Sequence, residues 1–264
     1  MKNLLVPVGS SGNAVNTLQY AIDFAEVVNA KIYVTQVYES TKVAGALKNI
    51  DAFLEEETKQ HLQEVLDQVN TKNVVVALAS VKGDVIESIE AMAKHLEIDL
   101  IVSSAKSVST DETLFLGKIP GKLVKDIDLP VLIVPTQYRF KPVSKILMAI
   151  KSGKIKPGRA LDPIKNIIKN FTARIDLIQI ITPRSTDEDK EVDNELKELV
   201  SSFKITENAT IYQGVLEYLH ETEPDMLCVM RRKRGFFTRL WQTDTVKKAH
   251  FESRIPLLVL KGIV

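Results

Sequence analysis

The sequence contains a single cysteine, Cys228, among its 264 residues. One cysteine excludes an intramolecular disulfide and a cysteine-rich metal cluster, and a reducing cytosol is the simplest compartment for such a chain. No apolar run approaches the roughly 20 residues that a membrane span needs, and the apolar stretch near the N-terminus is too short for a signal peptide. We therefore expect a cytoplasmic protein with no membrane partner.

Familiar catalytic and metal-binding patterns are also missing. The chain holds no Gly-x-Ser-x-Gly nucleophile elbow. Its four histidines fall on separate expected helices, so none pairs with another at the spacing of metal ligands. The carboxylates between residues 55 and 67 recur at helical spacing, which is typical of a solvated face. We expect no catalytic residues and no metal site. A binding protein is the leading class, and an enzyme is an alternative that no acid–base constellation in the sequence supports.

The composition is that of a globular protein, with 45% hydrophobic and 26% charged residues. The net charge of +1 conceals an asymmetry along the chain. Residues 1–140 carry 13 basic and 18 acidic side chains, whereas the rest carries 22 basic and 16 acidic ones. The difference indicates two units with different surfaces.

Short apolar runs alternate with helical periodicity along the whole chain, which predicts parallel βαβ units with right-handed crossovers. Asp84 is the expected N-cap of a helix, and Cys228 is the expected small core residue of a buried strand. The strands are expected near residues 4–8, 32–37, 74–78, 100–102, 131–134, 146–150, 175–181, 209–212, 226–230 and 257–260. The helices are expected near residues 13–29, 50–69, 85–96, 161–171, 192–203 and 215–219.

The order of elements occurs twice. The strand that begins at Asp99 lies 31 residues before the strand that begins at Pro130, and the same gap separates Asp225 from Pro256. Equal gaps between matching strands need no insertion or deletion. We therefore expect two domains, residues 1–138 and 144–264, with the junction near Pro142.

These features resemble a tandem universal stress protein. The opening strand with its following residues, Leu5-Val6-Pro7-Val8-Gly9-Ser10-Ser11, is similar to the first strand of that family, and the closing Pro-Val-Leu-Ile-Val of the first half is a further family feature. The resemblance implies two doubly wound open parallel α/β sheets, each with strand order 3-2-1-4-5 and flanked by helices. It also implies that the two closing strands pair in an intramolecular pseudo-dimer, and it leaves a homodimer open.

Many members of that family bind ATP through a Gly-x2-Gly-x9-Gly motif followed by Ser or Thr. Glycines let backbone amides approach phosphates, and the next helix offers its N-terminus to the anion. The resemblance assigns nucleotide-binding positions to Ser104, Ser107, Gly117 and Lys118, and further ones to Gly9 and Val37. Two of the three motif glycines are absent, and Gly9 stands where binding members have an Asp.

The second half departs further from the motif. Its matching positions are Met230, Lys233, Thr243 and Asp244, and Lys151 stands at the Asp position. The leading hypothesis is thus a non-enzymatic stress-response protein with a degenerate adenine-nucleotide site and no certain cofactor. The alternative is a working ATP binder with its site in the N-terminal domain.

Positive charge replaces the glycines of the second half. Two neighbouring expected strands end in basic residues, at the edge where open α/β sheets bind ligands. The first strand is followed by Lys151, and the second by Arg231, Arg232, Lys233 and Arg234. One hypothesis is an anion site for a phosphate, a nucleotide tail or an acidic partner. The other is a solvated basic edge. The partner is an unknown protein or a small anion, and a nucleic acid is not expected.

Overall fold

The computed structural model describes residues 1–9, 12–39, 50–106, 112–155, 159–231, 246–248 and 251–261. The first half of the chain contains β1 (Asn3–Pro7), α1 (Ala14–Val28), β2 (Lys31–Tyr38), α2 (Ile50–Asp67), β3 (Val76–Lys82), α3 (Val85–His95), β4 (Leu100–Ser104), β5 (Leu114–Leu116), α4 (Lys118–Asp126) and β6 (Val131–Val134). The second half contains β7 (Lys145–Ile150), η1 (Arg159–Leu161), α5 (Asp162–Phe171), β8 (Arg174–Ile181), η2 (Asp187–Lys190), α6 (Asn194–Leu199), β9 (Ser202–Glu207), α7 (Ile211–Thr222), β10 (Met226–Arg231), β11 (Val246–Lys247) and β12 (Leu257–Lys261).

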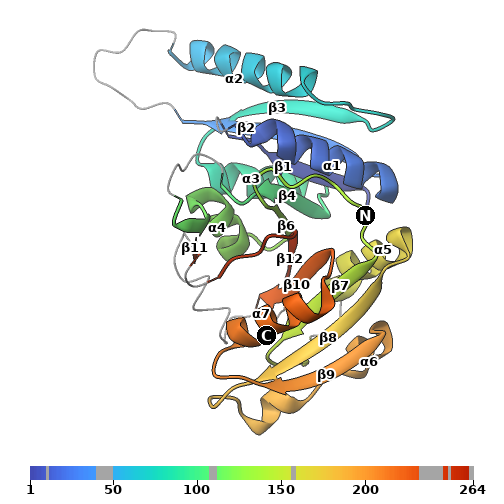
Figure 1. Cartoon of the computed structure of the whole chain (residues 1–264). Coiled ribbons are helices and arrows are strands. Elements are labelled where there is room, and N and C mark those ends of the chain that lie inside the picture. The colour runs from blue at the N-terminus through green and yellow to red at the C-terminus, as the bar shows by residue number, and fades with distance from the viewer. Residues whose placement is uncertain are drawn as a thin grey trace.

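Ten of these strands form one continuous sheet in the order β3-β2-β1-β4-β6-β12-β10-β7-β8-β9. Strands within each half are parallel, and each half has the predicted order 3-2-1-4-5 when its five strands are numbered along the chain. The α/β fold class is therefore confirmed. Figure 1 shows the two half-sheets meeting at β6 and β12 in the middle of the molecule.

The two closing strands pair, as expected, and they run antiparallel. Leu257 lies opposite Ile133, Leu258 opposite Leu132, and Val259 opposite Val131. All six side chains are fully buried. Because each closing strand is an apolar edge, the pairing removes both edges from water.

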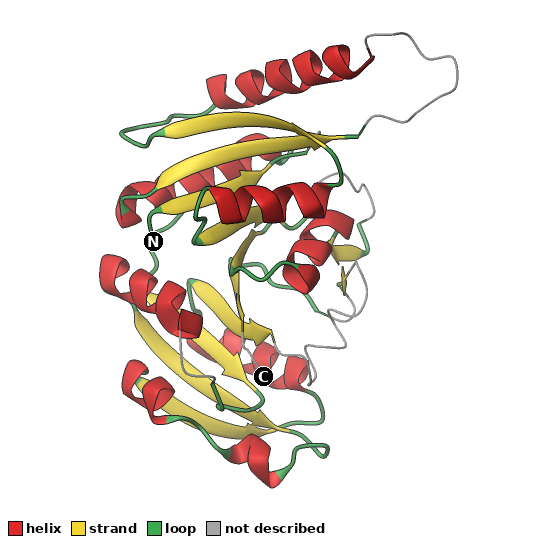
Figure 2. Ribbon diagram, turned by 180° about the vertical axis from the view of Figure 1, so that it is seen from behind, coloured by secondary structure: helices red, strands yellow, loops and turns green. Residues whose placement is uncertain are grey.

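Helices cover both faces of the sheet (Figure 2). On one face α1, α2, α5 and α6 pack over a continuous hydrophobic cluster that spans both halves. On the other face α3, α4 and α7 cover a second cluster. Strands buried on both faces explain the uninterrupted apolar runs of the sequence.

Aromatic side chains of the two halves pack against one another on the sheet face that α1 and α5 cover. Phe24 from α1 contacts Phe171 from α5, with ring centroids 5.3 Å apart. Phe140, in the segment between β6 and β7, contacts Phe171 at 6.2 Å and Tyr20 at 5.4 Å. The junction is thus packed into the core on this face.

Two aspartates hold equivalent places in the halves. The Asp99 carboxylate accepts hydrogen bonds from the backbone N–H groups of Lys2 and Asn3. The Asp225 carboxylate accepts them from Ser144 and Lys145, each at 2.9 Å. Each aspartate therefore ties the start of its half's first strand to the start of the fourth.

Local predictions are confirmed in part. The Asp84 side chain accepts hydrogen bonds from the N–H groups of Ile86 and Glu87 and caps α3, and Cys228 is buried. The strand expected near 74–78 lies at Val76–Lys82. The strand expected at 209–212 was wrong, because Thr210 accepts a hydrogen bond from Gln213 N–H and begins α7.

The helix expected at 192–203 was also wrong in its extent. The helix covers only Asn194–Leu199, and the edge strand β9 follows at Ser202–Glu207. That strand is largely exposed, so it lacks the apolar run that signals a central strand.

Candidate functional site

A small cleft lies at the carboxyl edge of the first half-sheet, next to the point where the chain order reverses between β1 and β4. The described residues enclose about 160 Å³ there. Ligand sites in proteins usually measure roughly 300–1,000 Å³, so this cleft is small for a nucleotide. It is lined by Pro7, Val8, Gly9, Thr35, Gln36, Val37, Val85, Ile89, Ser103 and Ile119.

The structure places two of the predicted site residues on this cleft. Gly9 follows β1, and Val37 lies near the end of β2. The register sets Val8 beside Thr35 through a backbone hydrogen bond of 2.8 Å, which brings the two strand ends together. Gly9 and Val37 are two of the positions that the resemblance assigns to nucleotide binding.

The serine hydroxyls at the end of β4 are engaged with backbone carbonyls. Ser104 Oγ donates to the carbonyl of Lys106 at 2.8 Å, and Ser103 Oγ donates to the carbonyl of Ser104 at 3.2 Å. Both side chains are buried. Ser104 therefore lies where the motif predicts but has its hydroxyl directed to the protein itself.

Gly117 and Lys118 form the start of α4. Gly117 is the N-cap, and its N–H donates to the carbonyl of Ala105 at 2.9 Å. Among the described residues no side chain caps this helix, and Lys118 is exposed at its first position. An uncapped helix N-terminus with a lysine is favourable for an anion. Ser107 lies outside the described residues.

In the second half the corresponding edge is covered by the chain itself. After β8 the chain folds back so that Gly153 forms a parallel bridge with Val192. Gly153 N–H donates to Glu191, and Asp193 N–H donates to Gly153. A Cβ atom on Gly153 would lie 2.6 Å from Val192 Cα, so only glycine allows this approach. Residues 186–193, which we call the covering segment, thus close the edge.

Lys151 pairs with the covering segment. Its Nζ lies 2.7 Å from Asp189 Oδ2, and the buried Gln179 amide donates to the carbonyls of Asp189 and Lys151. Burial raises the pKa of Asp189, but the hydrogen bonds from Lys151 and Thr186 and the charge of Lys151 outweigh it, so the net pKa lies below the usual range. Lys151 has a protein carboxylate as its partner.

Arg231 reaches away from Lys151, into the junction between the halves. Its Nη1 donates to the carbonyl of Val124 in α4 at 2.9 Å, and its neighbour across the strands is Lys261 of β12. Burial lowers the pKa of Arg231, and the charges of Asp128 and Asp126 partly offset this. The contacts of Lys151 and Arg231 do not join them in one site, and Arg232, Lys233 and Arg234 lie outside the described residues.

Sequence reasoning missed the helical wall of the cleft. Val85 and Ile89 of α3 and Ile119 of α4 line it. The signal was present, because Val85 and Ile89 belong to the apolar stripe of that helix, but a stripe alone does not distinguish a core contact from a cleft wall.

The described residues lack both a membrane-spanning helix and a cluster of metal ligands. They contain no helix long and apolar enough to cross a membrane. Nor do they bring together three or more His, Cys, Asp or Glu side chains in a way that could hold a metal ion.

Known proteins resemble this chain in sequence and in fold. The model of the universal stress protein family matches residues 1–135. Universal stress protein MJ0531 of Methanocaldococcus jannaschii is 23% identical over 50% of this chain and 81% of its own length. Stress response protein NhaX of Bacillus subtilis is 24% identical over 50% of this chain and 96% of its own length.

One solved structure matches nearly the whole chain. It is a universal stress protein from Archaeoglobus fulgidus, with a TM-score of 0.73, 20% identity and 98% coverage of both chains. At that identity the match shows the shared fold alone. Since the family model covers just over half of the sequence, the chain belongs to the universal stress protein family.

Proposed function

We propose that this protein is a cytosolic, non-enzymatic stress-response binding protein that retains one degenerate adenine-nucleotide site, in its first half. The observation that carries the proposal is the cleft of about 160 Å³ beside Gly9 and Val37. Two positions that the resemblance assigns to nucleotide binding, Gly9 and Val37, line this cleft, whereas the hydroxyl of the motif residue Ser104 donates to the Lys106 carbonyl.

The second half is, in this proposal, a diverged copy of the first that binds no nucleotide. Two observations support it. Its closing strand pairs with that of the first half in the same sheet. The edge that corresponds to the first cleft is covered through Gly153 and Val192.

The alternative is a working ATP binder, and the N-terminus of α4 with the exposed Lys118 favours it. Thermal unfolding with and without about 1 mM ATP–Mg²⁺ separates the two. A ligand present at 100 times its Kd stabilises the native state by about 2.7 kcal/mol. For a chain of this size that corresponds to a rise in Tm of roughly 5–10 °C. The degenerate site predicts a rise of less than about 2 °C.

A pair of variants locates whatever binding remains. Gly9→Asp restores the carboxylate that binding members have and should tighten ATP binding about three- to tenfold, measured by calorimetry. Lys151→Met changes the matching position of the second half and should leave the affinity unchanged, because Lys151 is committed to Asp189. A loss of ATP affinity in Lys151→Met would move the site to the second half and contradict the proposal.

A further inference from the structure

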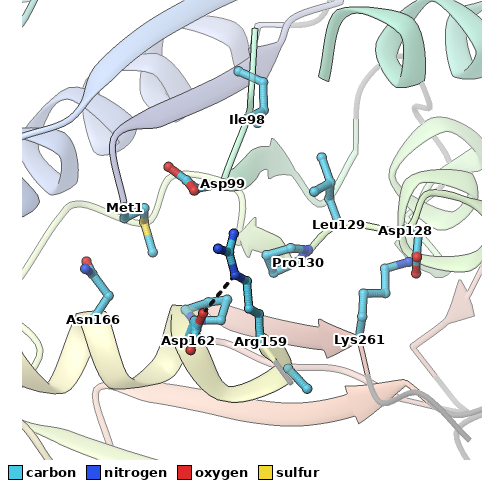
Figure 3. Close-up of a pocket in the computed structure, with 12 residues that line it drawn as sticks. Met1, Ile98, Asp99, Asp128, Leu129, Pro130, Arg159, Asp162, Asn166 and Lys261 are labelled. Atoms are coloured by element: carbon cyan, nitrogen blue, oxygen red, sulfur yellow. Dashed lines mark ion pairs between the residues drawn. The ribbon is translucent and has the colours of Figure 1, made fainter. Parts of the chain in front are cut away.

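A second and larger cleft lies at the junction between the halves, beside the starts of β4 and β6 (Figure 3). Its volume is about 330 Å³, within the usual range for a small ligand. The antiparallel pairing of β6 and β12 creates it, because the end of β12 comes to lie beside the start of β6. The lining residues are Met1, Ile98, Asp99, Asp128, Leu129, Pro130, Arg159, Ala160, Asp162, Pro163, Asn166 and Lys261.

Lys261 is the unusual member of this lining. It is only 8% exposed, and its Nζ makes one long hydrogen bond of 3.5 Å to the carbonyl of Val124. Arg231 donates to the same carbonyl at 2.9 Å and stands beside Lys261 in the strand register. The buried Lys261 amine and the partly buried Arg231 guanidinium therefore share one neutral acceptor.

The nearby carboxylates do not neutralise this pair. Among the described residues no carboxylate oxygen lies within 4.0 Å of Lys261 or Arg231. Asp126, Asp128 and Glu90 attract Lys261 from farther away, yet burial and the Arg231 charge still lower the pKa of Lys261 to about 7. A buried charge without a close counter-ion is unfavourable, so an anion bound at this place would be stabilised.

Two of the three carboxylates that line the cleft already have partners, and the third, Asp128, attracts Lys261 from farther away. The Asp99 carboxylate accepts backbone hydrogen bonds, and Asp162 lies 4.0 Å from Arg159. Arg159 is 96% exposed and points into the cleft, whereas the Lys261 side chain runs along its wall toward Asp128 (Figure 3). One cation therefore lies deep and another at the entrance.

We propose that this junction cleft binds a small organic anion. Its carboxylate or phosphate group would sit beside Lys261, and its apolar body would contact the wall formed by Ile98, Leu129, Pro130 and Pro163. The cleft is larger than an inorganic ion needs, and the apolar wall favours a ligand with a hydrophobic part.

Calorimetric titration with phenyl phosphate, benzoate and inorganic phosphate at constant ionic strength tests the proposal. Phenyl phosphate and benzoate share a ring and differ in the anionic group. Saturable binding of either supports the proposal and identifies the preferred group. Failure of both at about 10 mM overturns it. Inorganic phosphate that binds as tightly as phenyl phosphate also overturns it, because the apolar wall would then contribute nothing.

Variants assign the site. Lys261→Met replaces the buried cation by an apolar side chain of similar length and should weaken binding at least about tenfold. Arg159→Ala should weaken it about two- to fivefold. Lys165→Met, on the exposed face of α5 where Lys165 pairs with Glu195, is the matched control and should bind as the wild type does. Unchanged binding in Lys261→Met overturns the proposal.

A measurement on the wild-type protein tests the same assignment without depending on the folding of a variant. With lysine labelled at Cε, the NMR signal of Lys261 should move on addition of phenyl phosphate, and its pKa should rise because a bound anion favours the charged amine. Arg231, Asp126, Asp128 and Glu90 face the same amine, so the rise is judged against a titration without ligand. A Lys261 signal that does not respond contradicts the assignment.

Discussion

The two halves of this protein share a strand order and differ at the carboxyl edges of their sheets. In the first half a cleft remains beside Gly9 and Val37. In the second half Gly153 and Val192 bring the covering segment onto the matching edge. One strand order thus supports two different surfaces, because the loops and not the strands decide what an edge can bind.

A second difference lies at the ends of the fourth and closing strands. Arg231 and Lys261 are register partners in the second half. The residues 126 positions earlier are Ala105 and Pro135. At these two matching positions positive charge therefore occurs only in the second half, although the same two strands pair in both halves.

The largest expected effect tests whether the halves are one folding unit. Leu258→Ala removes a fully buried side chain where β12 meets β6, and it should lower the free energy of unfolding by about 2–5 kcal/mol. Urea unfolding followed by fluorescence and by far-UV circular dichroism should show one shared transition.

The matched control for that substitution lies on the outer edge of the second half. Ile205 is 55% exposed on β9, so Ile205→Ala should change the free energy of unfolding by less than about 0.5 kcal/mol. Two separate transitions in Leu258→Ala would mean that the halves fold independently and that the continuous sheet adds little.

Opening the covered edge should have the next largest effect. Gly153→Ala places a methyl group 2.6 Å from Val192 Cα, and the resulting shift should cost about 1–3 kcal/mol of unfolding free energy. Hydrogen exchange should rise in residues 186–193. Gly12→Ala is the control in the first half, because nothing lies within 4 Å of its Cβ position. Equal stability losses in both variants would refute the close approach.

Sequence reasoning found the scaffold because the scaffold depends on local patterns. Buried parallel strands appear in the sequence as apolar runs. Asp84, a residue type favoured at helix N-caps, predicted the start of α3. It failed where tertiary context decides. The edge strand β9 has no apolar run, and the α7 cap Thr210 was read as part of a strand.

The site was harder to predict for a related reason. Motif spacing predicts site positions at Gly9, Ser104 and Gly117, but spacing cannot reveal that the Ser104 hydroxyl donates to the Lys106 carbonyl. Nor can it show that Arg231 lies beside Lys261 and contacts Val124 of the first half, since that contact depends on how the two halves pair.

The buried Lys261 at the junction predicts that the stability of the wild type and that of Lys261→Met depend differently on pH. Burial and Arg231 lower the pKa of Lys261 to about 7 in the folded protein, below its value in the unfolded chain. Between these two values the unfolded state binds more protons, so stability should rise as the pH increases from about 7 to 10. Lys261→Met should lose that slope and be more stable than the wild type near pH 7, by about 1 kcal/mol or more.

Measuring Tm of both proteins from pH 6 to 10 checks this. Parallel curves for wild type and Lys261→Met would show that the amine is charged and well compensated throughout. Lys145→Met is the comparison at the start of β7, where the lysine lies 3.8 Å from Asp176 and has a close carboxylate partner. It should leave the slope as in the wild type.

The smallest expected effect concerns a helix N-cap that is an aspartate in one half and a threonine in the other. Asp84 and Thr210 lie 126 residues apart, as Asp99 and Asp225 do, and each caps the third α-helix of its half. Replacing either by alanine should lower Tm by a few degrees, because an N-cap hydrogen bond is lost. Only the aspartate cap should depend on pH. Hydrogen bonds from the N–H groups of Glu87 and Ile86 lower the pKa of Asp84, so its contribution is present above the ordinary carboxyl pKa and disappears as the pH falls through the depressed folded value. Tm profiles in which Thr210→Ala and Asp84→Ala lose the same increment at every pH down to 3 would show that the two caps are electrostatically equivalent.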